Sequence, residues 1–206
     1  MFNYKKAVQI ISWLLRKYKK GVARKLLLIK LIYFADKYHL RKYGRTVSGS
    51  EYIAMRYGPV ATKVLNVADQ KEEYLPLSAS KLASETFTLE SSGTFLRLID
   101  ITEATDSLSK TDIEALEFAF EKFGDIDAFK LAEITHHYPE WEKHKKELFS
   151  DENPNCKKSV PMDIRDFLAD APKGYEPCYS LSEEDKVFVL GLINDSEAID
   201  NFFKIQ

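Results

Sequence analysis

One segment constrains the fold of this chain more than any other, because residues 23–43 are apolar on nearly every face of the helix that they predict. A helix with so few polar faces is usually central to a hydrophobic core. Gly44 follows the segment and is typical of a helix end. The sequence therefore predicts a helical protein built around one buried helix. Its apolar side chains are Leu26, Leu27, Leu28, Leu31, Ile32, Phe34 and Tyr38.

Amphipathic patterns predict further helices around this one. Residues 4–18 place Ala7, Ile11 and Leu14 on one helical face, and a Lys-Lys-Gly sequence at 19–21 follows as a stop. Ser109 and Asp112 have the spacing of a capping box, which predicts a helix that ends at Gly124. Shorter patterns predict helices over the ranges 126–135, 163–169 and 183–204.

A smaller part of the chain predicts β structure. Residues 46–57 alternate with a period of two, which favours a short strand, and residues 86–101 favour a hairpin. Gly58-Pro59 is a turn that can also start a helix. The expected fold is mainly α with a small antiparallel β element, an α+β domain with a short strand or hairpin insertion. Residues 150–162 are polar and contain proline, which predicts an internal linker.

The composition favours a self-sufficient core in a reducing compartment. Hydrophobic residues make up 45% of the 206 residues, with 13 Phe and 11 Tyr, so a core needs no disulfide or metal to stabilise it. Cys156 and Cys178 have no CxxC motif or Cys/His cluster around them. The first residues contain no signal-peptide cleavage site, and no apolar run is long enough for a membrane helix. We expect a cytoplasmic protein without a membrane partner.

Charge is distributed unevenly along the chain. Residues 1–60 carry 14 Lys and Arg against only Asp36 and Glu51, a net of +12, whereas the whole chain has a net charge of −2. The basic portion could face nucleic acid, an acidic protein or the acidic remainder of the same chain. Lys30, Lys37 and Arg41 are spaced seven and four residues apart, and we expect them to face solvent.

Asp36 and His39 continue an apolar helical stripe formed by Ile29, Ile32 and Tyr43. The two polar side chains should therefore be half-buried and need hydrogen-bond partners, since an unpaired buried polar group costs about 1–3 kcal/mol. The possible partners are each other, an arginine (Arg45 or Arg56), or backbone amides of the 44–49 loop. A structural network, a contact with a partner protein and acid–base catalysis all remain open for this pair.

No motif indicates a catalytic centre or a cofactor site. Phosphate-binding glycine loops, HExxH and GxSxG are all absent, so we expect no enzyme activity, no cofactor and no metal. His136 and His137 lie on different sides of a helix and lack a third ligand at a recognised spacing. His136 with Trp141 is better interpreted as packing at a helix end. Three glycines are expected at turns with positive φ: Gly44, Gly49 and Gly58.

The second helix and the strand after it closely resemble the Panacea domain, the SocA-like antitoxin family that also includes phage-associated GepA-type proteins. The resemblance lies in three runs, KLIYFADKYHL, GRTVSGSEYIA and GPV, within residues 30–60. Ile32 and Val47 stand where the family usually has Leu and Ile. A second element, Thr135-His136 followed by Trp141, also matches. The resemblance as a whole covers about residues 5–145.

The resemblance implies an antitoxin that binds a cognate protein toxin, which SocA-like members can hand to a cellular protease. It implies a Panacea domain over residues 1–150. Residues 151–206 match no family motif, and their patterns predict a C-terminal helical extension packed on the same domain. A nucleic-acid-binding protein is the alternative, and a hydrolase or transferase around Asp36, His39 and His136 is a third. The oligomeric state stays open. The candidate signature or partner-binding residues are Tyr33, Asp36, His39, Arg45, Glu51, Tyr52, Arg56, Tyr57, Gly58, Pro59, His136 and Trp141.

Overall fold

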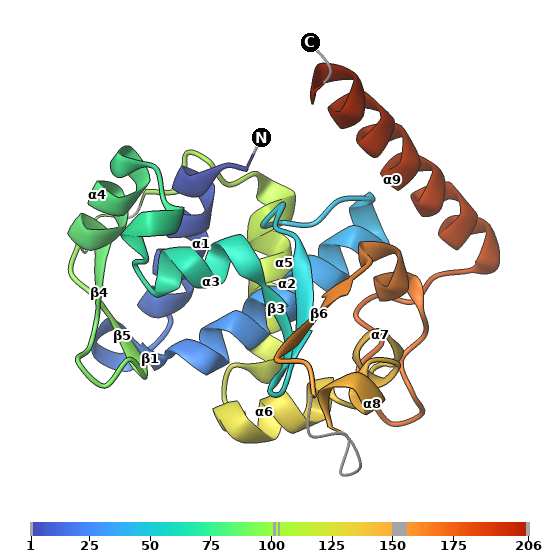
Figure 1. Cartoon of the computed structure of the whole chain (residues 1–206), viewed down its shortest axis with the longest axis horizontal. Helices are drawn as coiled ribbons and strands as arrows, with labels where there is room; N and C mark the ends of the chain where they lie inside the picture. The colour runs from blue at the N-terminus through green and yellow to red at the C-terminus, as the bar shows by residue number, and fades with distance from the viewer. Residues whose placement is uncertain (1, 101, 103, 150–155, 205–206) are drawn as a thin grey trace.

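A computed structural model describes residues 2–100, 102, 104–149 and 156–204. The described chain is mainly helical and contains two small antiparallel sheets of three strands each, which confirms the predicted fold class. Helix α2 (Lys25–Tyr43) runs through the middle of the molecule, and the other elements surround it (Figure 1). None of the helices in these ranges is both long and apolar enough to cross a membrane.

Helix α1 and the first sheet lie at one end of the molecule (Figure 1). Helix α1 (Tyr4–Arg16) begins at Asn3, whose side chain accepts a hydrogen bond from the Lys6 amide. The first sheet has the order β1-β5-β4, with β1 at Val22–Arg24, β4 at Phe87–Leu89 and β5 at Phe95–Leu98. The predicted 86–101 hairpin is confirmed. Residues 23 and 24, predicted as helix, instead pair with β5.

The second sheet joins distant parts of the chain in the order β3-β2-β6. Strand β2 (Tyr52–Met55) pairs with β3 (Gly58–Ala61) and with β6 (Ser159–Met162). The strand predicted over 46–57 is therefore shorter than expected. The prediction that Pro59 starts a helix was wrong, because Pro59 lies within β3 and the helix α3 begins at Thr62. Pairing with β2 explains the difference, since Pro59 stands opposite Ala54 in the ladder.

The remaining helices cover α2 and the sheets. The capping box at Ser109 and Asp112 is confirmed at the start of α5, as is the end of that helix at Gly124. Residues 159–162 of the predicted linker form β6, and residues 150–155 lie outside the described part of the chain. The division at residue 150 stays a prediction. The other elements are α3 (Thr62–Ala68), α4 (Leu77–Thr86), α5 (Lys110–Phe123), α6 (Ala128–Thr135), α7 (Pro139–Glu142), α8 (Lys145–Leu148) and α9 (Glu183–Lys204), with 3-10 turns at Lys19–Gly21, Glu72–Tyr74 and Ile164–Leu168.

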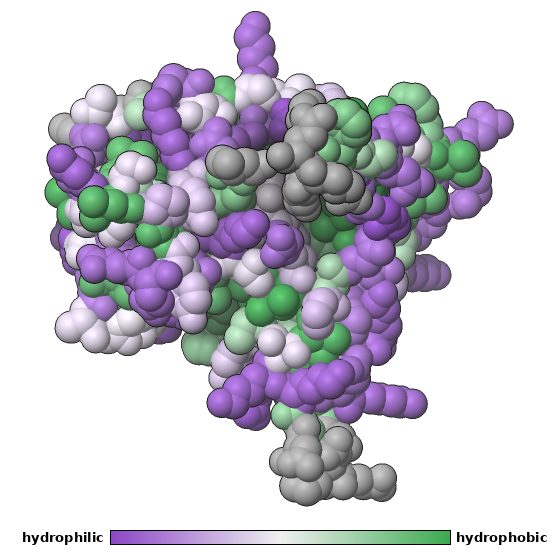
Figure 2. Space-filling view, turned by 45° about the horizontal axis from the view of Figure 1, so that its top comes forward, coloured by the Kyte–Doolittle hydropathy of each residue, from purple (hydrophilic) through white to green (hydrophobic). Residues whose placement is uncertain are grey.

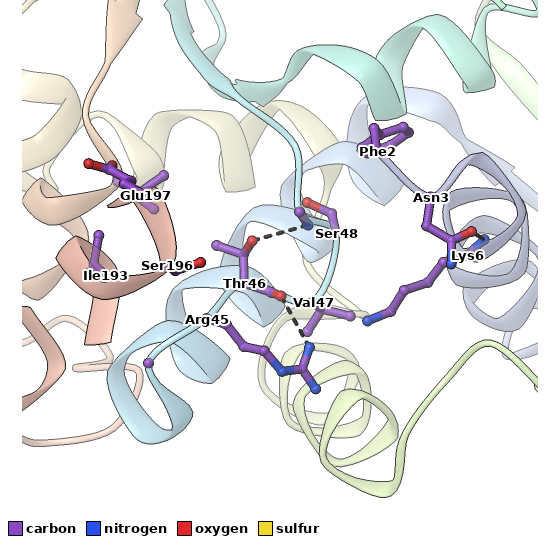
Figure 3. Close-up of a pocket in the computed structure, with 13 residues that line it drawn as sticks. Phe2, Asn3, Lys6, Arg45, Thr46, Val47, Ser48, Ile193, Ser196 and Glu197 are labelled. Carbon is purple, nitrogen blue, oxygen red and sulfur yellow. Dashed lines mark hydrogen bonds between the residues drawn. The ribbon is translucent and has the colours of Figure 1, made fainter. Parts of the chain in front are cut away.

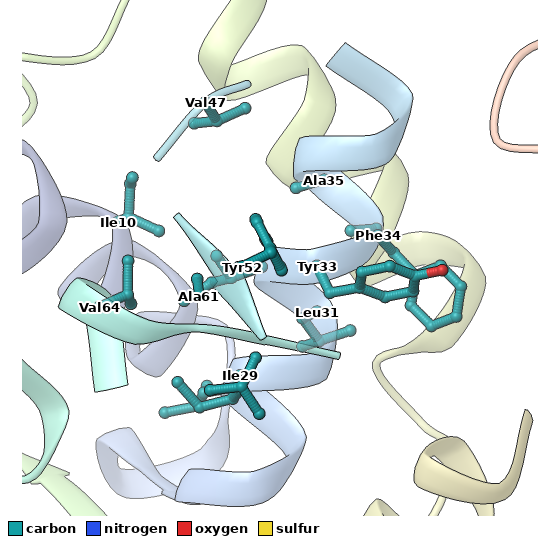
Figure 4. Packing of buried hydrophobic residues seen from close by; sticks show 14 of the residues in the cluster. Ile10, Ile29, Leu31, Tyr33, Phe34, Ala35, Val47, Tyr52, Ala61 and Val64 are labelled. Atoms are coloured by element: carbon teal, nitrogen blue, oxygen red, sulfur yellow. The ribbon is translucent and has the colours of Figure 1, made fainter. Parts of the chain in front are cut away.

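The hydrophobic core lies on both sides of α2. Ile29 of α2 lies on the side of Ile10 of α1 and Val64 of α3, whereas Leu31 and Phe34 point to the opposite side (Figure 4). There Phe34 stacks on Phe123 of α5 with ring centroids 3.8 Å apart. Burial on both sides agrees with the prediction of a central helix.

The polar side chains of α2 correct a sequence-based expectation. Lys30, Lys37 and Arg41 do not face solvent but are 0%, 0% and 1% exposed. Lys37 Nζ lies 2.6 Å from Glu140 Oε1, and the Arg41 guanidinium donates to the backbone oxygens of Phe167, Leu168, Ala169 and Tyr179. Helical spacing alone could not reveal this, because Lys37 and Arg41 meet partners from residues 138–179, and Lys30 donates to the Pro59 carbonyl.

The Lys37–Glu140 pair gives a test of this burial. Glu140→Gln leaves the buried Lys37 ammonium without a carboxylate, and we expect a loss of about 3–5 kcal/mol in the free energy of unfolding. Glu142→Gln, on the exposed side of the same short helix, should change it by about 0.5 kcal/mol or less. Urea unfolding followed by circular dichroism measures both. Equal stability of the two variants would contradict the buried pair.

Candidate functional site

The structure separates the twelve candidate residues into a buried group and an exposed group. Most of them are buried. Four are exposed, namely Arg45, Glu51, Arg56 and Tyr57, and His136 is partly exposed. The signature therefore marks mainly the internal framework. The buried residues are Tyr33, Asp36, His39, Tyr52, Gly58, Pro59 and Trp141.

Asp36 connects α2 to the following loop and to β2. Its Oδ1 accepts a hydrogen bond from the Ser48 amide at 2.8 Å, and its Oδ2 accepts from the Ser48 hydroxyl and from Tyr52 Oη, the latter at 2.6 Å. Of the partners that the sequence left open for Asp36, the structure shows a backbone amide of the loop. The side chain is fully buried and not half-buried. Burial raises the pKa of Asp36, and the three donors counteract part of this shift.

His39 bonds to different partners from Asp36. Its Nδ1 donates to the Arg45 carbonyl at 2.7 Å, and its Nε2 accepts from the Thr111 hydroxyl at 3.0 Å. Burial lowers the pKa of His39, although Asp112 lies 3.5 Å from its Nε2. His39 is thus a neutral link between α2, the loop and α5. Since Asp36 and His39 are 0% exposed, neither is placed to meet a substrate.

A cavity of about 400 Å³ lies beside this network, between the 44–49 loop, the start of α1 and α9 (Figure 3). Its two cations, Lys6 and Arg45, both contact Asp112, at 2.9 and 3.0 Å. Burial alone would raise the pKa of Asp112, but hydrogen bonds from Lys6 and Ser109 lower it to about 2. The positive charge at this cavity is therefore compensated from within the chain.

The turn between β2 and β3 brings the two separate parts of the signature together. Lys30 Nζ donates to the Pro59 carbonyl at 2.7 Å, and Trp141 Nε1 donates to the Met55 carbonyl at 2.9 Å. Gly58 has a φ of +95°, and a Cβ there would lie 2.1 Å from Thr135 Oγ1. Only glycine fits this position, both for its backbone conformation and for the close approach of α6.

The outer surface of this turn carries exposed aromatic side chains. Tyr57 and Phe129 are 52% and 49% exposed, and their ring centroids lie 6.1 Å apart. The Arg56 guanidinium lies 5.7 Å from the ring centroid of Phe149, which is 38% exposed. We name the surface formed by Arg56, Tyr57, Phe129, His136 and Phe149 the turn patch. It is the exposed surface to which the signature contributes most.

Two shallow cavities flank Phe149 and His136 in the turn patch, with volumes of about 300 and 520 Å³. The His136 ring stacks on Trp141 with centroids 3.8 Å apart. Burial, together with the charge of Lys30, lowers the pKa of His136 to about 4, although a hydrogen bond with the Arg56 backbone opposes the shift. His136 is therefore neutral near pH 7 and acts as part of an aromatic surface.

Sequence reasoning missed two members of the turn patch, Phe129 and Phe149. Phe129 carries a usable signal, because the buried side chains of α6 follow the helical spacing 128, 131, 132 and 135, and Phe129 lies off that stripe. A large aromatic on the polar side of a helix is a feature that needs an explanation. Phe149 carries no such signal, since it follows the short helix α8.

Part of the basic portion of the chain pairs with the acidic portion of the same chain, which was one of the three possibilities left open by the sequence. Pairs join Lys25 to Asp69, Lys42 to Glu114 and Lys37 to Glu140. Figure 2 shows one face of the surface, on which hydrophilic side chains are interspersed with separate small areas of hydrophobic surface. In the described ranges, no three His, Cys, Asp or Glu side chains are grouped to hold a metal ion.

Comparison with known proteins identifies a family. Residues 28–142, more than half of the chain, match the family described as Antitoxin SocA-like, Panacea domain. No curated protein and no solved structure matches the chain.

Lys30 beneath the β2–β3 turn gives a pH-dependent prediction. Burial lowers its pKa from 10.5 to about 7, so between these values the unfolded chain binds a proton that the folded chain does not. The contribution of Lys30 to stability should thus rise with pH across this window. We expect the stability of the parent relative to Lys30→Met to increase by about 2 kcal/mol from pH 7 to pH 9. Urea unfolding at both pH values tests this, and a difference independent of pH would contradict it.

Proposed function

The chain belongs to the SocA-like antitoxin family with a Panacea domain, and we propose that it neutralises a cognate protein toxin by direct binding. The proposal includes action by binding alone, without catalysis, in the cytoplasm. It also includes delivery of the bound toxin to a cellular protease, as the family resemblance implies.

We propose the turn patch as the surface that contacts the toxin. The observation that carries this is the exposure of Tyr57, Phe129 and Phe149 around Arg56. Aromatic residues and arginine are enriched at the centres of protein interfaces, where they supply most of the binding free energy. A soluble domain has little reason to leave three large aromatics exposed side by side unless a partner covers them.

In this proposal the buried signature residues hold the turn patch in place. Lys30, Gly58 and Trp141 fix the backbone of the β2–β3 turn from three directions. A turn fixed in this way loses little conformational entropy on binding, which favours affinity. In this way the buried signature residues affect toxin binding by fixing the positions of Arg56 and Tyr57.

The alternative of nucleic-acid binding receives little support from the distribution of charge. Lys6, Lys25 and Lys42 contact carboxylates of the same chain, and Lys37 and Arg41 are buried. Cations that are already paired release fewer counterions from a phosphate backbone. We therefore do not propose a nucleic-acid partner.

The toxin-binding proposal predicts a specific loss of neutralisation. The family resemblance implies that the toxin is encoded beside the antitoxin. Production of this neighbouring-gene product alone should inhibit growth, and co-production of this protein should restore it. The double variant Tyr57→Ala/Phe129→Ala should weaken binding by about 2 kcal/mol or more and abolish rescue, because it removes two aromatic anchors. Growth in liquid culture and isothermal titration with the purified product measure the two effects.

Tyr74→Ala is the matched control, because Tyr74 is 58% exposed but lies on the 3-10 turn Glu72–Tyr74, outside the turn patch. It should rescue growth as well as the parent does. If no neighbouring product is toxic, the antitoxin proposal fails. If Tyr57→Ala/Phe129→Ala rescues fully, the toxin binds elsewhere.

The charge pairing predicts weak binding to nucleic acid. Labelled duplex DNA and mixed-sequence single-stranded RNA should bind no more tightly than the nonspecific range of about 10⁻⁴–10⁻⁶ M at ~0.15 M salt. Fluorescence anisotropy at two salt concentrations measures this. Nanomolar binding that is lost when Lys19, Lys20, Arg24 and Lys25 are replaced by Glu would favour the nucleic-acid alternative.

A further inference from the structure

The larger of the two cavities in the turn patch, at about 520 Å³, has a wall that combines aromatic, imidazole and carboxylate groups. His136 and Phe149 form one part of this wall, and Glu133 and Glu142 form another. A cavity of this size falls in the range of ligand-binding pockets and can hold a side chain of a partner protein. The chemistry of the wall therefore indicates which kind of side chain fits.

The imidazole of His136 carries an unused hydrogen-bond acceptor. The backbone carbonyl of Arg56 can only accept, so the imidazole nitrogen that bonds to it carries the hydrogen. This nitrogen is Nδ1, because Nε2 is buried and has no hydrogen-bond partner among the described residues. In the neutral ring Nε2 is therefore an acceptor. A buried acceptor without a donor costs free energy, and a donor placed in the cavity would remove that cost.

The two carboxylates decide the charge of the group that fits. Glu133 and Glu142 are exposed, and within the described ranges neither forms an ion pair. Lys145 is the only Lys or Arg among the described residues of this wall, so the carboxylates leave an excess of one negative charge. An anion from a partner would meet like charges and the lone pair of His136 Nε2. A cationic hydrogen-bond donor is therefore favoured over an anionic group.

Phe149 adds an aromatic ring to this wall. It lines both cavities, whereas Arg56 lines only the smaller one. The Arg56 guanidinium lies 5.7 Å from the centroid of the Phe149 ring, a distance at which a cation is attracted to an aromatic face. The Phe149 side chain remains 38% exposed, so it can make the same kind of contact with a cation in the larger cavity.

From the acceptor, the charge and the aromatic ring we infer that the larger cavity binds an arginine side chain of the toxin. The inference rests on the proposed function, which supplies the toxin as the partner. A guanidinium has five N–H donors in one plane, so it can donate to His136 Nε2 and to a carboxylate while its flat face lies on Phe149. A lysine ammonium has no flat face and matches this wall less well.

The chemistry of the site can be tested without the toxin. Acetyl-Leu-Arg-Leu-amide is titrated into the ¹⁵N-labelled full-length protein, and a neutral peptide with citrulline in place of arginine is the control. The indole N–H signals of Trp141, on the cavity wall, and Trp13, in α1, report the two places separately. The arginine peptide should shift the Trp141 signal saturably and bind about fivefold or more tightly than the citrulline peptide. Equal binding of the peptides, an equal shift of Trp13, or no saturable shift would overturn the inference.

Growth rescue tests the same site in the toxin complex. Glu133→Lys/Glu142→Lys replaces both carboxylates by cations and should abolish rescue, because it weakens toxin binding about tenfold or more. Glu117→Lys/Glu121→Lys makes the same change on two exposed carboxylates of α5 and should rescue as the parent does. Full rescue by Glu133→Lys/Glu142→Lys would refute the arginine site. Arginine-specific binding at Trp141 where no neighbouring product is toxic would support the site and refute only the antitoxin proposal.

Discussion

The structure depends on satisfying the ionisable side chains that α2 carries into the core. An unpaired buried charge costs several kcal/mol, so each of these groups requires a partner in a defined position. Asp36 takes hydrogen bonds from Ser48 and Tyr52, and Lys37 pairs with Glu140. Each partner comes from a different element, and together they hold the 44–49 loop, β2 and α7 against the central helix. The polar network thus specifies one arrangement where apolar packing alone would permit several.

The same requirement explains why most residues of the family signature are buried, although many of them are polar. Asp36 and His39 resemble a catalytic pair in the sequence. In the structure both are engaged in internal hydrogen bonds. The part of the signature at the surface is the β2–β3 turn, whose backbone carbonyls accept hydrogen bonds from the buried side chains of Lys30 and Trp141. The proposed function by binding agrees with this rigidity, since a rigid turn presents Tyr57 at a small entropic cost.

Charge is used in two ways in this chain. Within the body, the basic residues of the first sixty positions meet carboxylates from later segments, as Lys6 and Arg45 meet Asp112. On α9 the carboxylates are instead left exposed beside apolar side chains. Internal pairing of this kind holds distant segments of the chain together. Net charge alone, at −2, reveals neither use.

The sequence by itself determined the elements whose cause is local: the central helix, its end at Gly44, the capping box at Ser109 and the 86–101 hairpin. Each depends on side-chain periodicity or on backbone preferences within a few residues. Only the tertiary structure decided the burial of Lys30, Lys37 and Arg41, because their partners lie between 29 and 138 residues away along the chain. It also decided the turn patch, which joins residues from three separate segments. Helical spacing specifies which side chains share a face, but whether that face meets water or another segment depends on contacts that are distant in sequence.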